Sequence, residues 1–415
     1  MSLPRYAKYK DSGVEWLGDI PTHWEIAPLK WMLDIQNGSD HKHVETDEGH
    51  PVIGSGGPFT YASQYLYDGE SVLLGRKGTV DKPLYVTGKF WTVDTMYWTK
   101  ISPAACGKFC YYAALTIPFD LYSTNTALPS MTKGVLSAHP IARPSFEEQS
   151  DIAAFLDRET GKIDALIAEQ EKLLTLLAEK RQATISHAVT RGLNPNAPMK
   201  NSGVPWLGEV PAHWNMDRVG ALYGETAELG NDELPILSVS IHDGVSDKEL
   251  DDAEMDRKVT RSDDRSKYKR VLPNDLTYNM MRAWQGGFGT VAVMGQVSPA
   301  YVVARPRGEL RTVFVEQLLR TPHAIEQVRR YSRGITEFRL RLYWDEFKNI
   351  RIALPPLAEQ DEILSVITSM AEKFDALSRE AESAISLLKE RRSALIAAAV
   401  TGKIDVRRTE EILAA

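Results

Sequence analysis

Two long segments of the chain place apolar residues at helical spacing on one face. In residues 148–189 Gly161 is the one glycine and there is no proline. Residues 359–400 repeat the pattern. At ~1.5 Å per residue such a helix is roughly 60 Å long, and a single apolar stripe over that length needs a partner. We predict two helices that pair in antiparallel orientation, the alternative being that each packs on its own globular domain. The stripes consist of Ile152, Leu156, Ile163, Leu166, Ile167, Leu173, Leu174 and Leu177, and of Ile363, Ile367, Phe374, Leu377, Leu388, Leu395 and Ile396.

The chain also contains an internal repeat. Residues 12–18 (SGVEWLG) recur as residues 202–208 (SGVPWLG), at an offset of 190. Residues 141–149 (IARPSFEEQ) match residues 352–360 (IALPPLAEQ) at an offset of 211, so the middle of the second half is 21 residues longer. This period is too long for a solenoid. It indicates a duplicated domain, whose two copies usually lie about a pseudo-two-fold axis.

The middle of each half reads as short β-rich runs punctuated by glycine. The α+β class follows: two similar domains, each a mixed, curved β-sheet with short helices, joined by the two antiparallel coiled-coil helices. Short helices are expected at residues 107–115 and 312–330. The strands are expected at residues 71–74, 84–86, 90–93, 235–239, 290–293 and 301–303. The expected boundaries are residues 1–145 for the first domain, 146–192 for its helix, 193–354 for the second domain and 355–415 for its helix.

Composition narrows the class of protein. The chain has 415 residues and a net charge of -7, with no signal-peptide core and no apolar run of membrane length, so we expect a soluble, cytoplasmic protein. Charge is segregated into blocks: residues 225–256 hold eleven acids and one lysine, whereas residues 257–270 hold seven basic residues. A negative total therefore does not exclude a nucleic-acid partner.

A search for catalytic motifs nominates no residue. There is no G-x-x-x-x-G-K-[ST] loop and no dinucleotide-binding glycine motif after a strand. Cys106 and Cys110 lack a second cysteine pair or a nearby histidine, so no metal site is expected. The glycine-rich residues 54–57 read as a plain turn, and His41 and His43 as part of a polar loop.

The remaining candidates are basic, glycine-containing loops at corresponding places in the two halves. Gly78-Thr79-Val80 aligns with Gly289-Thr290-Val291 at the offset of 211, and Arg76 aligns with Arg282 if five residues are inserted. Arginine reads guanine or pairs with phosphate, glutamine reads adenine, and glycine lets the backbone approach phosphate. A second basic segment precedes each long helix. The nominated DNA-binding residues are Arg76, Lys77, Gly78, Thr79, Ser130, Thr132, Lys133, Arg282, Trp284, Gln285, Arg333, Arg339 and Arg341.

These features together resemble one known family, the specificity subunits of type I restriction–modification systems. The resemblance rests on the Pro-x-x-Trp openings at residues 21–24 and 211–214 and on Pro-Pro-Leu-x-Glu-Gln at residues 355–360. A degenerate copy stands at residues 144–149, and Ala-Val-Thr ends both helices. The resemblance covers essentially the whole chain, and its most specific part is the order of two variable domains, each followed by a helix.

The resemblance implies a non-catalytic, sequence-specific DNA-binding subunit. Each variable domain is expected to read one part of a split target, and the helices to space the readers and dock two methyltransferase subunits and restriction subunits. It implies no cofactor in this chain, S-adenosylmethionine in the methyltransferase subunits, and ATP and Mg in the restriction subunit. The nominated docking and spacer positions are Glu148, Gln149, Leu166, Leu173, Leu177, Glu359, Gln360, Leu377, Leu388 and Leu395.

Two other functions stay open on the sequence alone. One alternative is the recognition subunit of a related bifunctional, type IIB- or IIG-like restriction–methylation enzyme, against which the missing catalytic motifs count. A coiled-coil scaffold without DNA is the other, against which the large duplicated middles count.

Overall fold

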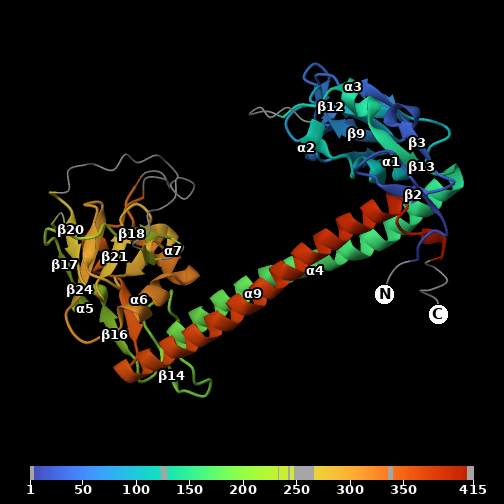
Figure 1. The fold of residues 1–415 in the computed structure, drawn as a ribbon. Coiled ribbons are helices and arrows are strands. Elements are labelled where there is room, and N and C mark those ends of the chain that lie inside the picture. Colours follow the sequence, from blue (N-terminus) through green and yellow to red (C-terminus); the bar gives the residue numbers. More distant parts are fainter. Residues whose placement is uncertain are drawn as a thin grey trace. The chain divides into compact units, whose positions relative to one another are not determined.

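A computed structural model describes residues 4–122, 129–231, 233–241, 244–246, 266–334 and 340–408. The chain divides into a first unit, residues 1–171 with 382–415, and a second unit, residues 172–381 (Figure 1). Two long helices, α4 (Phe146–Arg191) and α9 (Leu357–Val400), each contribute one part to either unit. Both helices were predicted, and each begins two residues before the apolar pattern that starts at residue 148 or 359.

Within each unit the two long helices pair in antiparallel orientation, which confirms the predicted pairing. In the first unit Ile152 and Leu156 of α4 share a core with Ile396 and Val400 of α9. In the second unit Val189 of α4 shares a core with Ile363 and Ile367 of α9. Ion pairs repeat the arrangement, because Arg392 binds Asp164 at 2.8 Å in the first unit and Arg181 binds Asp375 at 2.6 Å in the second.

The first unit is built around an antiparallel sheet in the order β10-β9-β12-β4, onto which α1 packs. A five-stranded sheet, in the order β5-β7-β6-β11-β8, lies beside it and contains one parallel pair, β6 with β11. The helices are α1 (Gly107–Ala114), α2 (Phe119–Tyr122) and α3 (Lys133–Ala138), with a 3-10 turn η1 (Leu29–Trp31). The strands are β1 (Tyr9–Asp11), β2 (Asp19–Pro21), β3 (Glu25–Pro28), β4 (Leu33–Asn37), β5 (Glu45–Thr46), β6 (His50–Gly54), β7 (Gly57–Ala62), β8 (Tyr67–Asp68), β9 (Ser71–Gly75), β10 (Leu84–Val86), β11 (Lys89–Thr92), β12 (Met96–Ile101) and β13 (Pro140–Arg143).

The second unit repeats this sheet in the order β22-β21-β24-β17, with α6 packed on β22. Its helices are α5 (Val219–Leu222), α6 (Thr312–Leu319), α7 (Pro322–Tyr331) and α8 (Trp344–Phe347), with a 3-10 turn η2 (Ala283–Gln285). Its strands are β14 (Met199–Asn201), β15 (Glu209–Pro211), β16 (Asn215–Arg218), β17 (Tyr223–Thr226), β18 (Ser238–Ser240), β19 (Gly244–Ser246), β20 (Lys269–Val271), β21 (Leu276–Asn279), β22 (Phe288–Thr290), β23 (Gly295–Val297), β24 (Tyr301–Pro306) and β25 (Arg351–Leu354). The α+β class and the duplicated plan are therefore confirmed.

Three expected elements of the second half differ in the structure, the first being the strand expected at residues 235–239, which is β18 and begins only at Ser238. The helix expected at residues 312–330 is two helices, because the Thr321 side chain caps α7 and Pro322 opens it. The strand expected at residues 290–293 is instead β22, which ends at Thr290. Gly289 lies inside β22, where a Cβ would be 2.4 Å from the backbone nitrogen of Val245, so this position requires glycine. Among the described residues, no helix combines the length and the apolar character needed to cross a membrane.

Candidate nucleic-acid interface

In the first unit, the two basic segments nominated from the sequence lie side by side at one end of the central sheet. Residues 76–79 follow β9, and residues 129–133 precede and begin α3. The backbone nitrogen of Gly78 donates to Pro129 at 2.9 Å, and that of Met131 donates to Arg76 at 2.9 Å. Gly78 has a φ of +80°, a left-handed conformation that favours glycine, so the loop turns tightly at this residue.

The side chains of this first-unit loop divide into held and exposed groups. The Arg76 guanidinium donates to the Asp94 carbonyl at 3.2 Å and lies 5.8 Å from the Tyr97 ring centroid, so its position is fixed. Lys77, Thr79 and Lys133 are exposed. The hydroxyl of Thr132 caps α3 by accepting from the Val135 nitrogen at 3.3 Å, so its first role is structural.

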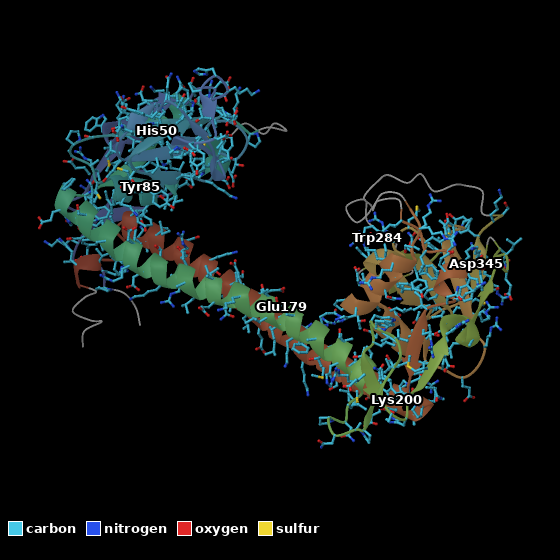
Figure 2. The ribbon with its side chains drawn as sticks, turned by 180° about the vertical axis from the view of Figure 1, so that it is seen from behind. His50, Tyr85, Glu179, Lys200, Trp284 and Asp345 are labelled. Atoms are coloured by element: carbon cyan, nitrogen blue, oxygen red, sulfur yellow. The ribbon has the colours of Figure 1, made fainter. Side chains whose placement is uncertain are left out.

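The second unit brings its two segments together in the same way. The backbone nitrogen of Leu342 donates to Met280 at 2.9 Å, which joins the segment before α8 to the loop after β21. That loop contains η2, where the Arg282 guanidinium donates to Gln285 at 2.9 Å and the Trp284 indole donates to the Met281 carbonyl at 2.9 Å. Trp284 is labelled in Figure 2.

Arg333 and Arg341 of the second unit form an antiparallel bridge with backbone bonds of 2.9 Å in both directions. Both side chains are exposed, and the Arg333 guanidinium pairs with Glu346. Arg339 lies outside the described residues, as do the acids at positions 251–256. The bridge holds two nominated arginines next to the loop that carries Arg282.

The strand register corrects the sequence alignment of the two loops. Tyr97 pairs with Leu74 in the first unit, and Val302 pairs with Tyr278 in the second. The bonds from Met131 and Leu342 then make Arg76 the counterpart of Met280, not of Arg282. Residues 76–83 and 280–287 are linkers of equal length, so the alignment with five inserted residues is wrong.

Sequence reasoning missed a second set of loops at this end of the first unit. The turn at residues 93–96 accepts backbone bonds from Arg76 and Lys77, both at Thr95. The loop at residues 38–43 is fixed by two indoles: Trp91 donates to Ser39 at 2.9 Å and Trp98 donates to Asn37 at 3.0 Å. The two tryptophans, in strands that follow the loop in sequence, were the available signal for an ordered rather than a plain polar loop.

The Glu-Gln pair at the start of each long helix, buried except for the half-buried Glu359, attaches that end of the helix to the unit around it. Gln149 accepts from the Cys106 nitrogen at 2.9 Å, where α1 begins. Gln360 accepts from the Arg311 nitrogen at 2.9 Å, where α6 begins. Because Glu148, Gln149 and Gln360 are at most 3% exposed, the structure assigns them to this attachment rather than to the docking surface expected from the sequence.

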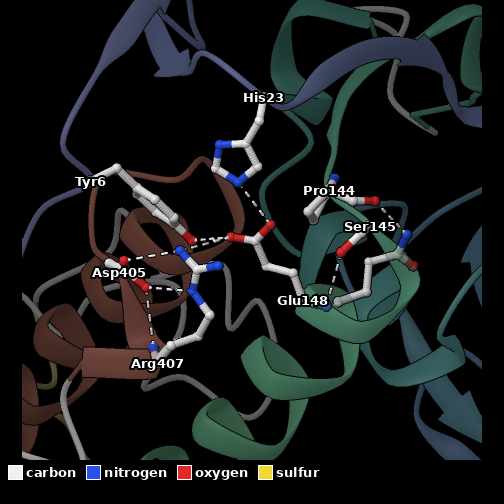
Figure 3. A network of polar contacts seen from close by, with 8 residues as sticks. Tyr6, His23, Pro144, Ser145, Glu148, Asp405 and Arg407 are labelled. Carbon is white, nitrogen blue, oxygen red and sulfur yellow. Dashed lines mark hydrogen bonds and ion pairs between the residues drawn. The ribbon is translucent and has the colours of Figure 1, made fainter.

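The Glu148 carboxylate is the centre of a network that the second unit has only in part (Figure 3). It accepts from Tyr6 at 2.7 Å, lies 3.1 Å from His23 and lies 3.8 Å from Arg407. Burial and the bond to Glu148 raise the pKa of Tyr6 well above its usual value. In the second unit, Glu359 lies 2.6 Å from His213 and accepts from the Trp214 indole at 3.1 Å.

The nominated leucines of the long helices differ in exposure. Leu166, Leu173 and Leu377 are 51%, 41% and 48% exposed, whereas Leu177, Leu388 and Leu395 are partly buried. Within the described residues, no group of three histidine, cysteine or acidic side chains is placed to hold a metal ion.

Comparison with known proteins decides the family. A family model described as "Type I restriction modification DNA specificity domain" matches residues 21–175. The EcoDI specificity subunit of Escherichia coli is 21% identical over 93% of this chain and 90% of its own length. The EcoBI specificity subunit of the same organism is 22% identical over 95% and 89%. The chain belongs to the type I restriction–modification specificity subunits.

The fold agrees with this membership. One chain of a solved structure, described as the "structural basis underlying complex assembly and conformational transition of the type I R-M system", matches with a TM-score of 0.58. It is 15% identical and covers 92% of this chain and 98% of its own length. The matched specificity domain, residues 21–175, includes the loops at residues 76–79 and 129–133 and the Glu148-Gln149 pair. The candidate interface loops of the first unit therefore lie within the part that the family model matches, and those of the second unit lie outside it.

Proposed function

We propose that this specificity subunit reads a split DNA target, one part with each unit, through the loops at the matching ends of the two central sheets. The observation that carries the proposal is the shared frame of these loops. In both units backbone bonds tie the linker after the second central strand to the segment that precedes a later short helix, α3 in the first unit and α8 in the second. The same backbone frame with different side chains is what two readers of two different sequences require.

The cations at these loops supply the chemistry for DNA. Lys77 and Lys133 are exposed in the first unit, and Arg333 and Arg341 in the second. Lysine and arginine at such positions pair with phosphates and release condensed counterions, so affinity falls steeply with salt. The net charge of -7 is compatible with this role because subunits bound to the chain contribute further phosphate contacts.

We further propose that the long helices space the two readers and dock the other subunits of the complex. Leu166, Leu173 and Leu377 expose apolar surface on helices whose other faces are already paired. Such surface fits burial against protein partners. The partners would be two methyltransferase subunits that bind S-adenosylmethionine, together with restriction subunits that use ATP and Mg. The chain itself is proposed to be non-catalytic.

The test exchanges one reader in the complete system. Residues 30–140 are replaced by the corresponding residues of a relative with a different target, and methylated sites in a host that carries all subunits are mapped by sequencing. We expect one part of the split target to change while the other part and the gap between them stay the same. A change in both parts, or in neither, contradicts the proposal. The exchange of residues 220–350 is the matched reciprocal experiment.

A further inference from the structure

The first unit has a β-hairpin, made by β6 and β7, next to the candidate interface loops. The Val93 nitrogen donates to Ile53 of β6 at 3.3 Å, and the Ser39 nitrogen donates to Thr92 at 2.9 Å. Two residues further along, Thr95 accepts from Arg76 and Lys77. The segment at residues 92–96 thus fastens the loop at residues 38–43, the hairpin tip and the Arg76 loop to one end of the unit.

The hairpin presents one aromatic ring on a rigid support. The Phe59 side chain is 59% exposed, although its ring edge packs against His41 with ring centroids 5.2 Å apart at 88°. The ring also lies next to Gly54, where a Cβ would be only 3.4 Å from one of its carbons. His41 is itself 17% exposed and lies 3.9 Å from Asp40. The ring is therefore held in place while much of it faces solvent, so little side-chain entropy is lost when it makes a contact.

The tip of the hairpin is small and open. Residues 54–57 are Gly-Ser-Gly-Gly, and a Cβ at Gly56 would meet no atom within 4 Å. Such a tip lets a backbone approach a phosphate closely. Lys42, in the neighbouring loop, is exposed and adds a cation. The acidic residues at positions 45, 47 and 48 lie in and directly after β5, which pairs with the end of β7 opposite the tip.

The corresponding hairpin of the second unit, β18 with β19, is occupied by its own unit. The Arg320 guanidinium donates to the Ile241 carbonyl at 2.6 Å, and a Cβ at Gly244 would lie 2.9 Å from Glu316. Both strands contact β22. This hairpin packs onto the sheet and α6, and its described residues, 238–241 and 244–246, include no aromatic side chain.

From this geometry we infer that the β6–β7 hairpin is a second DNA-contacting surface of the first unit. The inference rests on the proposed function and extends it to residues outside the loops at 76–79 and 129–133. The ring of Phe59 would lie against a base or sugar at the edge of the target part read by this unit. The Gly-rich tip and Lys42 would follow the adjacent phosphates of duplex DNA.

The test measures DNA binding by the complete methyltransferase–specificity complex. Phe59→Ala is expected to raise the Kd for the cognate duplex about tenfold, because the ring's apolar contact with the DNA is lost. Gly56→Glu, which adds a negative charge at the tip, is expected to raise the Kd for cognate and random duplexes alike, with an effect that shrinks as salt rises. Two matched controls lie away from this surface. Trp31→Ala removes another exposed ring, beyond the opposite end of β4, and Gly308→Glu adds the same charge at an open turn of the second unit.

The outcomes separate this inference from the proposed function. Support requires that both hairpin variants bind more weakly than their controls, and that Phe59→Ala loses hydroxyl-radical protection only in the target part read by the first unit. Hairpin variants that bind as tightly as the controls, in a complex that still prefers its target and is weakened by Lys77→Ala, overturn this inference alone. A wild-type complex that binds every duplex equally overturns the proposed function, and this inference with it.

Discussion

The two units share a backbone frame and differ in the side chains that the frame carries. Arg76 and Met280 occupy the same position, since each accepts a bond from the counterpart residues Met131 and Leu342. Arg76 is held over Tyr97, whereas Met280 packs against the core and the arginine of the second loop stands two residues later, as Arg282. A common frame with non-equivalent cations means that corresponding loops are expected to read different bases.

The units also differ in their closure, by which we mean the chain segments that complete each unit. In the second unit one continuous segment leads from α4 through Gly192 into β14. In the first unit both ends of the chain meet: the Asp405 nitrogen donates to the Pro4 carbonyl at 2.8 Å, and Ile404 and Val406 enter the core. The closure of the first unit therefore depends on contacts between segments at opposite ends of the sequence, which makes it the more sensitive of the two to single substitutions.

The largest difference is expected from alanine at the glycine that follows each long helix. Gly402 and Gly192 both have a φ of +73°, which costs any other residue about 1–2 kcal/mol. A Cβ at Gly402 would in addition lie 2.4 Å from Pro21 Cδ, whereas the nearest atom at Gly192 is 3.3 Å away. We expect Gly402→Ala to destabilise the first unit by about 3 kcal/mol and Gly192→Ala the second by about 1 kcal/mol.

Hydrogen exchange resolved by peptide measures the two units separately, which a single melting curve of a chain with two units does not. Equal losses of protection in the two variants would contradict the difference in closure, because the φ cost is the same at both glycines.

The carboxylates at the starts of the helices give the next comparison. Glu148 is 3% exposed and joins Tyr6, His23 and Arg407, whereas the Glu359 side chain is 23% exposed and joins His213 and Trp214. Glu148→Gln leaves a buried site without its charge-assisted bonds and is expected to cost about 2 kcal/mol, against about 0.5 kcal/mol for Glu359→Gln. Exchange rates of the N-terminal strands in each unit report the two costs. A larger loss of protection in Glu359→Gln than in Glu148→Gln would contradict the greater stabilisation expected from the buried Glu148 contacts.

The long helices and the duplication were predictable because both are carried by local patterns. Helical spacing of apolar residues is visible within a few turns, and repeated segments need no knowledge of contacts. The places of the two basic loops also followed, since they flank short apolar runs of the kind that form strands. The single helix expected at residues 312–330 is two helices in the structure. Thr321 and Pro322 are a helix-start signal, but the apolar pattern on both sides of them favoured one continuous helix.

The register of the loops and the role of Gln149 and Gln360 were not predictable in the same way. Gly-Thr-Val matches Gly-Thr-Val at the same offset as the long helices. The pairing of β9 with β12 and of β21 with β24 nevertheless makes Arg76 the structural counterpart of Met280. Gln149 and Gln360 bind backbone atoms 43 and 49 residues away. Contacts of that separation are set by tertiary packing, and a glutamine before an apolar run reads equally well as a surface residue.

A pH difference between the units is expected from His139, whose counterpart is Ile350. The two backbones make equivalent bonds, from Leu29 to His139 and from Val219 to Ile350. The His139 ring is 2% exposed and stacks on Trp16 at 5.0 Å, and burial lowers its pKa to about 4. Between about pH 6.5 and pH 4 the unfolded chain therefore binds a proton that the folded unit does not, so the free energy of unfolding falls as the pH falls through this window.

From pH 7 to pH 5 this amounts to about 2 kcal/mol for the first unit. His139→Ile, which installs the residue of the second unit, is expected to remove that part of the pH dependence and leave the second unit unchanged. Stability at each pH is measured by hydrogen exchange, with Trp31→Ala as a control that leaves the histidine in place. An undiminished pH dependence in His139→Ile would show that another group is responsible.

The smallest expected effect tests the non-equivalence of the loop cations directly. Arg282 lies at the start of η2 and donates to Gln285, so its guanidinium is partly committed within the loop. Arg282→Ala is expected to weaken binding of the complete complex to its target by about 1 kcal/mol, roughly fivefold. If Arg282 reads a base, the loss is confined to one position in the part read by the second unit. A phosphate contact instead weakens all duplexes equally and flattens the salt dependence.

Arg307→Ala, at the opposite end of β24, is the control. Wild-type affinity and specificity in Arg282→Ala would remove this residue from the interface, and a loss at a position read by the first unit would contradict the assignment of one target part to each unit.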